Sequence, residues 1–260
     1  MNWMEIVREI SRWIHVVAGI TWIGHLYFFN WVNGNFQPTM DAETKKKVNP
    51  ELMPRALYFF RMGALFTWLF GVVLLGMVFY MDPLGSMGLS EMGGRQWASV
   101  ALVFIAPFIY DFLASGPMKA PPAAFWGGWI LTTVAYFIFH QVGQFNYRGS
   151  AIHVGAMFGT IMAFNVWFRI WPAQQKIIGG LKSGEPVDAA LAPMAGLRSK
   201  HNTYMSVPLV FAMLNMHNTF AAPGEAGKFA GVDWVFPVII LVGFVGTYHI
   251  YQASTKVKGF

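Results

Sequence analysis

The chain has 260 residues, of which 55% are hydrophobic and 12% are charged, and its formal net charge is +6. In an ordinary soluble domain about a quarter of the residues are charged. The low charged fraction of this chain and its mean hydropathy of +0.45 exclude that class. The chain contains no cysteine, which excludes disulfides, iron–sulfur clusters, thiolate-bound zinc and covalently attached c-type haem.

Apolar runs long enough to cross a bilayer recur along the chain. A hydrocarbon core of about 30 Å needs about 20 apolar residues in a helix. The sequence therefore predicts an all-α, polytopic membrane helix bundle of about seven transmembrane helices, forming one domain over residues 1–260. The predicted spans are residues 10–31, 57–81, 96–114, 123–142, 151–171, 204–220 and 234–251.

The basic residues lie in short segments between these runs, which indicates membrane topology rather than a nucleic-acid surface. We therefore expect the lipid bilayer as a partner and no nucleic acid. Most basic residues follow the first, third and fifth spans or end the chain, so the positive-inside rule predicts a periplasmic N-terminus and a cytoplasmic C-terminus. Residues 172–202, the longest polar segment, are predicted to form a cytoplasmic loop with a short amphipathic helix.

Histidines near the outer ends of four predicted spans are the main candidates for a functional site. Polar side chains in hydrocarbon are costly and usually face the bundle interior. At about 1.5 Å per residue, the predicted orientation places four of them at one level. A b-type haem held by two imidazoles needs ligands from different helices at matched depth. We therefore predict that these residues bind haem iron, with one or two haems and the pairing open: His15, His140, His153 and His217.

Other arrangements of the same histidines stay open. Two of them can bind iron while two contact haem propionates or substrate, or all four can form a copper site. Each one alone is also compatible with hydrogen bonding to interfacial water or lipid headgroups. A weaker, deeper layer contains His25 and His249 as candidate ligands of a second haem, with Asp111 near the inner end of its span. His201 is expected at the cytoplasmic edge without a clear partner.

Two segments carry a resemblance to a known family. The first span, RWIHVVAGITWIGHLYFFNW, and the second, PELMPRALYFFRMGALFTWLFGVVLL, resemble the membrane domain of the bacterial cytochrome c-linked urate oxidase family, the urate oxidase N-terminal domain. The likeness continues through most of the chain. It implies a multi-pass protein of the bacterial inner membrane, with redox chemistry at the outer face and electrons passed to a cytochrome c domain.

This sequence departs from the family pattern. Members are expected to have eight spans and a periplasmic cytochrome c domain, whereas about seven spans and no cysteine pair are found here. The family's histidine followed by glycines is replaced by Asn33, Gly34 and Asn35. In the second span Arg61, Met62 and Gly63 stand where the family has an acidic residue.

These observations lead to three functional hypotheses. The first is a b-haem protein that transfers electrons at the periplasmic face, as a subunit or partner of a periplasmic cytochrome c or of a larger respiratory or photosynthetic complex. The second is a urate oxidase-like enzyme that uses a separate cytochrome c. The third is a non-redox structural or assembly subunit of a membrane complex.

Overall fold

The computed structural model describes residues 3–215, 228–229 and 232–257, and nearly all of them are helical. Two short strands pair antiparallel. The prediction of an all-α bundle is confirmed. The elements in chain order are α1 (Trp3–Tyr27), η1 (Phe28–Asn33), α2 (Gly34–Phe36), η2 (Gln37–Thr39), α3 (Ala42–Leu75), η3 (Gly76–Tyr80), α4 (Pro83–Met87), α5 (Gly94–Ser115), α6 (Pro121–Phe137), η4 (Ile138–Val142), α7 (Tyr147–Asn165), η5 (Val166–Ile170), α8 (Trp171–Ser183), α9 (Leu191–Asn215), β1 (Lys228–Phe229), β2 (Val232–Asp233) and α10 (Val235–Ser254).

Five helical segments in the described part of the chain are long and apolar enough to cross a membrane. Large apolar side chains on the outside of the bundle are exposed, among them Phe112 at 76% and Val242 at 63%, which is the surface that lipid tails solvate. The protein is therefore a multi-pass membrane protein. The five segments are Ala42–Tyr80, Gly94–Ser115, Pro121–Val142, Tyr147–Ser183 and Val235–Ser254.

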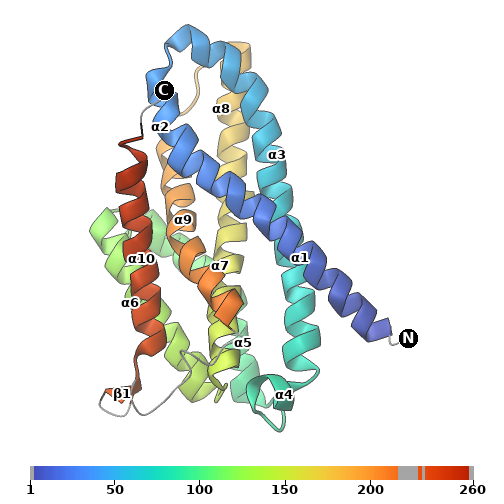
Figure 1. Ribbon diagram of the computed structural model, residues 1–260. Helices are drawn as coiled ribbons and strands as arrows, with labels where there is room; N and C mark the ends of the chain where they lie inside the picture. Colours follow the sequence, from blue (N-terminus) through green and yellow to red (C-terminus); the bar gives the residue numbers. More distant parts are fainter. Residues whose placement is uncertain (1–2, 216–227, 230–231, 258–260) are drawn as a thin grey trace.

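Two further helices of 25 residues each, α1 and α9, belong to the same bundle. They are more polar than the other five, because α1 carries Glu5, Arg8 and Arg12 in its first half and α9 carries Arg198 and Lys200. α1 begins toward the end that carries α4, whereas α10 ends at the opposite end of the bundle (Figure 1).

The core lies around the helix that runs from α7 through η5 into α8. In its most apolar stretch 61% of the residues are buried, compared with 22–33% in the other four spans. α3, α5, α6 and α9 all contact α7. The functional candidates that face the interior therefore face this central helix.

Close packing also joins α1 to α3, and α1 crosses α3 obliquely (Figure 1). A Cβ atom at Gly63 would lie 3.0 Å from the backbone nitrogen of Trp22 and 3.1 Å from the carbonyl oxygen of Ala18. Small residues at such crossings let two membrane helices approach closely. The glycine therefore sets the contact distance between α1 and α3.

Four helices in the described part of the chain change from α-helical to π-helical hydrogen bonding: η1 continues α1, η3 continues α3, η4 continues α6, and η5 joins α7 to α8. Each π-helical segment contains a polar side chain that forms a hydrogen bond outside it: Asn30, Tyr80, His140 and Arg169. π-Helical turns inside α-helices are frequent at functional sites, so these side chains are candidates for a functional site.

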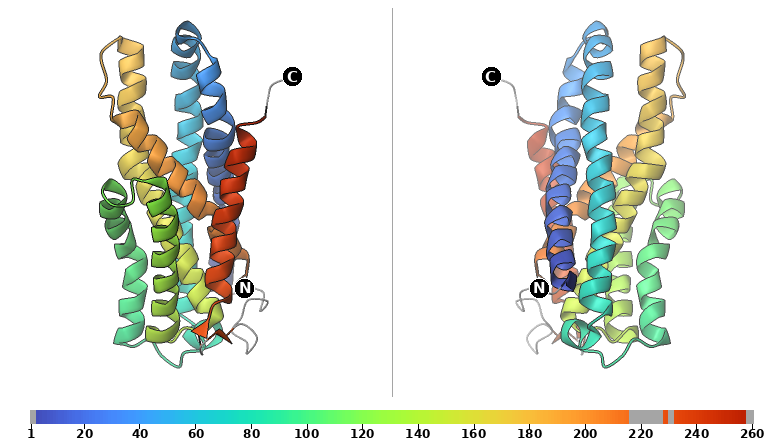
Figure 2. Two further views of the ribbon diagram at one scale, coloured as in Figure 1. Left: turned by 90° about the vertical axis from the view of Figure 1, so that its left-hand side faces the viewer. Right: turned by 90° about the vertical axis from the view of Figure 1, so that its right-hand side faces the viewer.

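The structure contains the helix predicted within residues 172–202, but most of this segment is not a loop. The central helix continues as α8 to Ser183, α9 begins at Leu191, and only residues 184–190 link them. The helix persists beyond its apolar stretch because α8 packs against α3, where the Arg61 guanidinium lies 3.8 Å above the Trp171 ring. α8 and the start of α3 extend well beyond α5 and α6 at this end (Figure 2).

Candidate functional site

His153 on α7 is fully buried, and both of its ring nitrogens make hydrogen bonds. Nδ1 lies 2.6 Å from the carbonyl oxygen of Gly149 and therefore carries the proton, while Nε2 lies 3.1 Å from the Tyr80 hydroxyl and accepts from it. The rings of Phe139 and Phe145 pack against it, at centroid distances of 5.4 Å and 4.6 Å. This conformation leaves no ring nitrogen of His153 free to bind iron.

His140 on η4 lies at the same end of the bundle as His153. Its Nδ1 donates to the carbonyl oxygen of Phe145 at 3.0 Å, and its ring stacks on Tyr136 at 5.9 Å with an interplanar angle of 7°. Phe145 contacts His153 through its own ring. The structure thus brings two of the four predicted histidines to one region.

His15 on α1 lies at a different level. Its Nδ1 donates to the carbonyl oxygen of Thr67 on α3 at 2.8 Å. The next residue of α3, Trp68, donates to Thr160 of α7 at 3.2 Å. Thr160 is two turns along α7 from His153, roughly 10 Å at 1.5 Å per residue. The obliquity of α1 explains the difference, because depth counted along the sequence is not depth in the bundle.

Two of the remaining candidate histidines, His25 and His249, are not brought to this region, and His217 lies outside the described residues. His25 packs against α3, with its ring 6.0 Å from that of Phe59, and His249 is exposed on α10. Within the described ranges, no three His, Cys, Asp or Glu side chains gather closely enough to hold a metal ion.

Two of the predicted histidines, His15 and His140, have one ring nitrogen bound to the backbone. His15 and His140 each donate Nδ1–H to a backbone carbonyl, and Nε2 of each makes no hydrogen bond within the described part of the chain. A metal-bound histidine has this arrangement, with the outer N–H fixed and the other nitrogen available. His15 contacts Thr67 on α3, whereas His140 contacts Phe145. Each histidine therefore fits binding of a metal through one imidazole, and the two do not fit as a pair on one haem iron.

Two arginines from different helices, Arg169 and Arg198, bind the Asp111 carboxylate. Arg169 of η5 donates Nε–H to the carboxylate at 2.8 Å, and its second nitrogen also contacts that carboxylate. Arg198 of α9, only 2% exposed, lies 2.9 Å from the same carboxylate and donates to Ser115 at 2.8 Å. The group joins α5, η5 and α9 through ion pairs, in which the Arg198 side chain is buried and the Arg169 side chain is 41% exposed.

A second polar group lies beside it and includes His201. The Tyr110 hydroxyl is 2.8 Å from His201 Nδ1 and also accepts from the Asn165 amide at 3.2 Å. Asn165 donates to Asn202 at 2.8 Å. The expectation that His201 lacks a partner is wrong, because its partner is 91 residues away on α5 and no local spacing reveals it.

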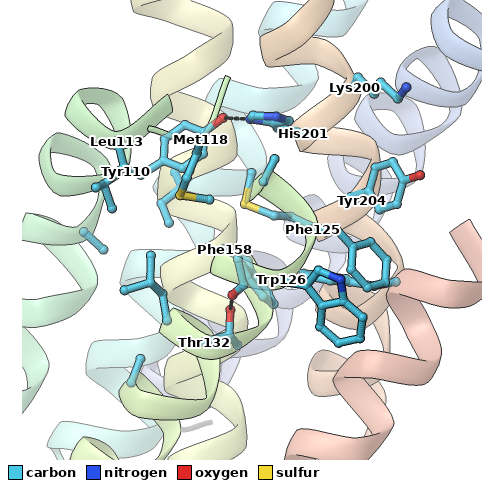
Figure 3. Close-up of a pocket in the computed structure, with 18 of the residues that line it drawn as sticks. Tyr110, Leu113, Met118, Phe125, Trp126, Thr132, Phe158, Lys200, His201 and Tyr204 are labelled. Carbon is cyan, nitrogen blue, oxygen red and sulfur yellow. Dashed lines mark hydrogen bonds between the residues drawn. The ribbon is translucent and has the colours of Figure 1, made fainter. Parts of the chain in front are cut away.

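A cavity of about 540 Å³ lies beside this pair, between α5, α6, α7, α9 and α10. Figure 3 shows the Tyr110–His201 hydrogen bond at one end and aromatic side chains such as Phe125 and Trp126 further along. The volume lies within the range of small-molecule pockets, which are mostly apolar with a few polar groups. Sequence reasoning missed this site because its lining comes from five separate helices.

Comparison with known families gives one match. The family model described as "Urate oxidase N-terminal" matches residues 1–47 and 42–258, which together cover almost the whole chain. No curated protein and no solved structure matches the chain.

Proposed function

The chain belongs to the urate oxidase N-terminal family, and on this premise we propose that it is a membrane redox protein that binds b haem and transfers electrons at one face of the bilayer. The observation that supports the proposal is the hydrogen bonding of the ring nitrogens of His15 and His140. Each has its Nδ1–H bound to a backbone carbonyl and its Nε2 unpaired within the described residues, which is how histidines that bind a metal are oriented.

In this proposal, residues of the chain hold each imidazole in one tautomer and one orientation. The carbonyl oxygens of Thr67 and Phe145 fix the rings of His15 and His140. A b haem, when bound, supplies a one-electron couple whose potential depends on the axial ligand and its hydrogen bonds. Copper is the less favoured metal for the same nitrogen donors.

The proposed topology has seven spans, with α1 and α9 added to the five most apolar helices. Basic residues such as Lys46, Arg55 and Lys182 belong to the extended start of α3 and to α8. The positive-inside rule supports a cytoplasmic location for this end, a periplasmic N-terminus and a cytoplasmic C-terminus. The proposed membrane is the bacterial inner membrane. His140 and His153 then face the periplasmic side, where a cytochrome c or a cytochrome-containing complex is the expected partner.

A reduced-minus-oxidised absorption spectrum of the purified protein, with haem extraction, tests the proposal directly. We expect a b-type spectrum that is weakened or lost in His15→Ala or His140→Ala and kept in the matched control His249→Ala, whose histidine is exposed on α10. Absence of haem and of bound metal from the wild-type protein rejects the proposal. Retention of the full spectrum in every histidine variant rejects these ligands.

The family's name supports a second candidate, a urate oxidase-like enzyme that uses a separate cytochrome c. Urate-dependent reduction of added cytochrome c by membranes containing the protein tests it. No turnover in a haem-loaded preparation rejects this activity and leaves electron transfer. A haem-free protein that still supports a partner complex indicates the structural or assembly role instead.

A further inference from the structure

The cavity beside Tyr110 and His201 has one polar end and long apolar walls. Phe158 on α7 and Phe244 on α10 contribute to the walls, and Trp126 on α6 lies toward their far end (Figure 3). Thr132 also lines the cavity, but its hydroxyl donates to the carbonyl oxygen of Gly128 and is satisfied within its own helix. A ligand here therefore meets aromatic surface over most of its area.

The hydrogen bonds around His201 determine whether its second ring nitrogen acts as a donor. The Tyr110 hydroxyl oxygen accepts a hydrogen bond from the Asn165 amide, and its own O–H donates to His201 Nδ1, 2.8 Å away. His201 then carries its remaining proton on Nε2, which makes no hydrogen bond within the described residues. A neutral N–H donor at the end of an apolar cavity favours a ligand with a carbonyl or ether oxygen at one end.

The cavity also has lining residues that reach the outer surface of the bundle. Ile109 on α5 is 47% exposed, and Leu131 and Val134 on α6 are 44% and 49% exposed. In a membrane this surface faces lipid tails. A hydrophobic molecule dissolved in the bilayer can therefore enter between α5 and α6 without passing through water.

We propose that this cavity binds a lipid-soluble quinone. Its flat ring packs against the aromatic walls, one ring carbonyl accepts Nε2–H of His201, and its hydrocarbon tail passes Ile109 and Leu131 toward the lipid. A fatty acid is the competing occupant, because Lys200 also lines the cavity. The inference goes beyond the proposed haem function and does not depend on it, since every group it uses lies outside the histidines proposed to bind metal.

Binding of decylubiquinone to the purified protein in lipid nanodiscs, followed by quenching of tryptophan fluorescence, tests the proposal. We expect saturable quenching that palmitate does not displace. His201→Phe keeps a ring but removes the N–H donor, and should weaken binding about fivefold to tenfold. His201→Gln restores an N–H donor and should recover most of the affinity.

Two further variants separate binding from folding. Ala135→Leu fills part of the cavity wall and should also weaken binding, while His249→Phe, on the exposed face of α10, should leave it unchanged. Circular dichroism checks that each variant is helical. Non-saturable quenching by the wild type, displacement by palmitate, or equal affinities for wild type and a folded His201→Phe variant would overturn the proposal. Each readout is independent of haem content.

Discussion

Arg198 on α9 contacts Asp111 on α5 twice, through an ion pair with the carboxylate at 2.9 Å and a hydrogen bond to the backbone carbonyl oxygen at 3.1 Å. The guanidinium is almost completely buried, and it lies 5.2 Å from the centroid of the Tyr110 ring. One side chain therefore stabilises the contact between α5 and α9 and packs against the residue that holds His201.

Replacing Asp111 with alanine should strongly destabilise the protein. The change leaves Arg198 as a buried charge without its carboxylate, which typically costs about 3–5 kcal/mol. Unfolding in a titration with SDS, followed by circular dichroism, measures the loss. The double variant Asp111→Ala/Arg198→Met should lose less than the single one, because it removes the unpaired charge.

The exposed pair Lys47–Glu43 provides the control for this experiment. Its nitrogen–oxygen distance is 2.7 Å, but the two side chains are 74% and 79% exposed. Exposed ion pairs contribute little because water and salt screen them, so Lys47→Ala should leave unfolding unchanged. Equal effects of Asp111→Ala and Lys47→Ala would contradict a structural role for the buried pair.

Gly63→Ala should loosen the contact between α1 and α3. Its new methyl group meets backbone atoms of Trp22 and Ala18 at 3.0–3.1 Å, and backbone cannot rotate away as a side chain can. Such overpacking costs about 1–3 kcal/mol. Gly24→Ala on α1 is the matched control, because a Cβ there meets nothing within 4 Å; it should be neutral or stabilising by up to about 1 kcal/mol. The same SDS titration compares the two, and equal losses would contradict the close approach.

The sequence predicts the spans well where a helix is uniformly apolar. The runs at 96–114 and 123–142 correspond to Gly94–Ser115 and to α6 with η4, Pro121–Val142. The sequence does not predict the ends of a helix where tertiary packing determines them. The polar residues after Trp171 remain helical because α8 lies against α3, which a hydropathy pattern does not contain.

The site was less predictable than the fold. His140 and His153 are near each other as predicted, because they lie at neighbouring ends of successive spans. His15 was misplaced in depth because α1 is oblique. The partner of His201 is on α5, 91 residues away, and only the assembled bundle brings the two side chains together.

Tyr80→Phe tests the buried hydrogen bond to His153. Removing the hydroxyl leaves Nε2 of a fully buried imidazole without a donor, which costs about 1–3 kcal/mol. Tyr58→Phe, at a tyrosine that is 47% exposed, should have no measurable effect. Unchanged stability of Tyr80→Phe would contradict the structural role of this hydrogen bond.

The absence of cysteine makes the proposed membrane orientation directly testable. Lys46 near the start of α3 and Glu91 between α4 and α5 are both exposed. The start of α3 and the segment after α4 lie at opposite ends of the bundle (Figure 1). With a cytoplasmic α8 end, a membrane-impermeant maleimide added to intact, outer-membrane-permeabilised cells should label Glu91→Cys. Lys46→Cys should react only after the inner membrane is opened, because its thiol faces the cytoplasm. The reverse pattern would invert the topology and move His140 and His153 to the cytoplasmic side, away from any periplasmic cytochrome.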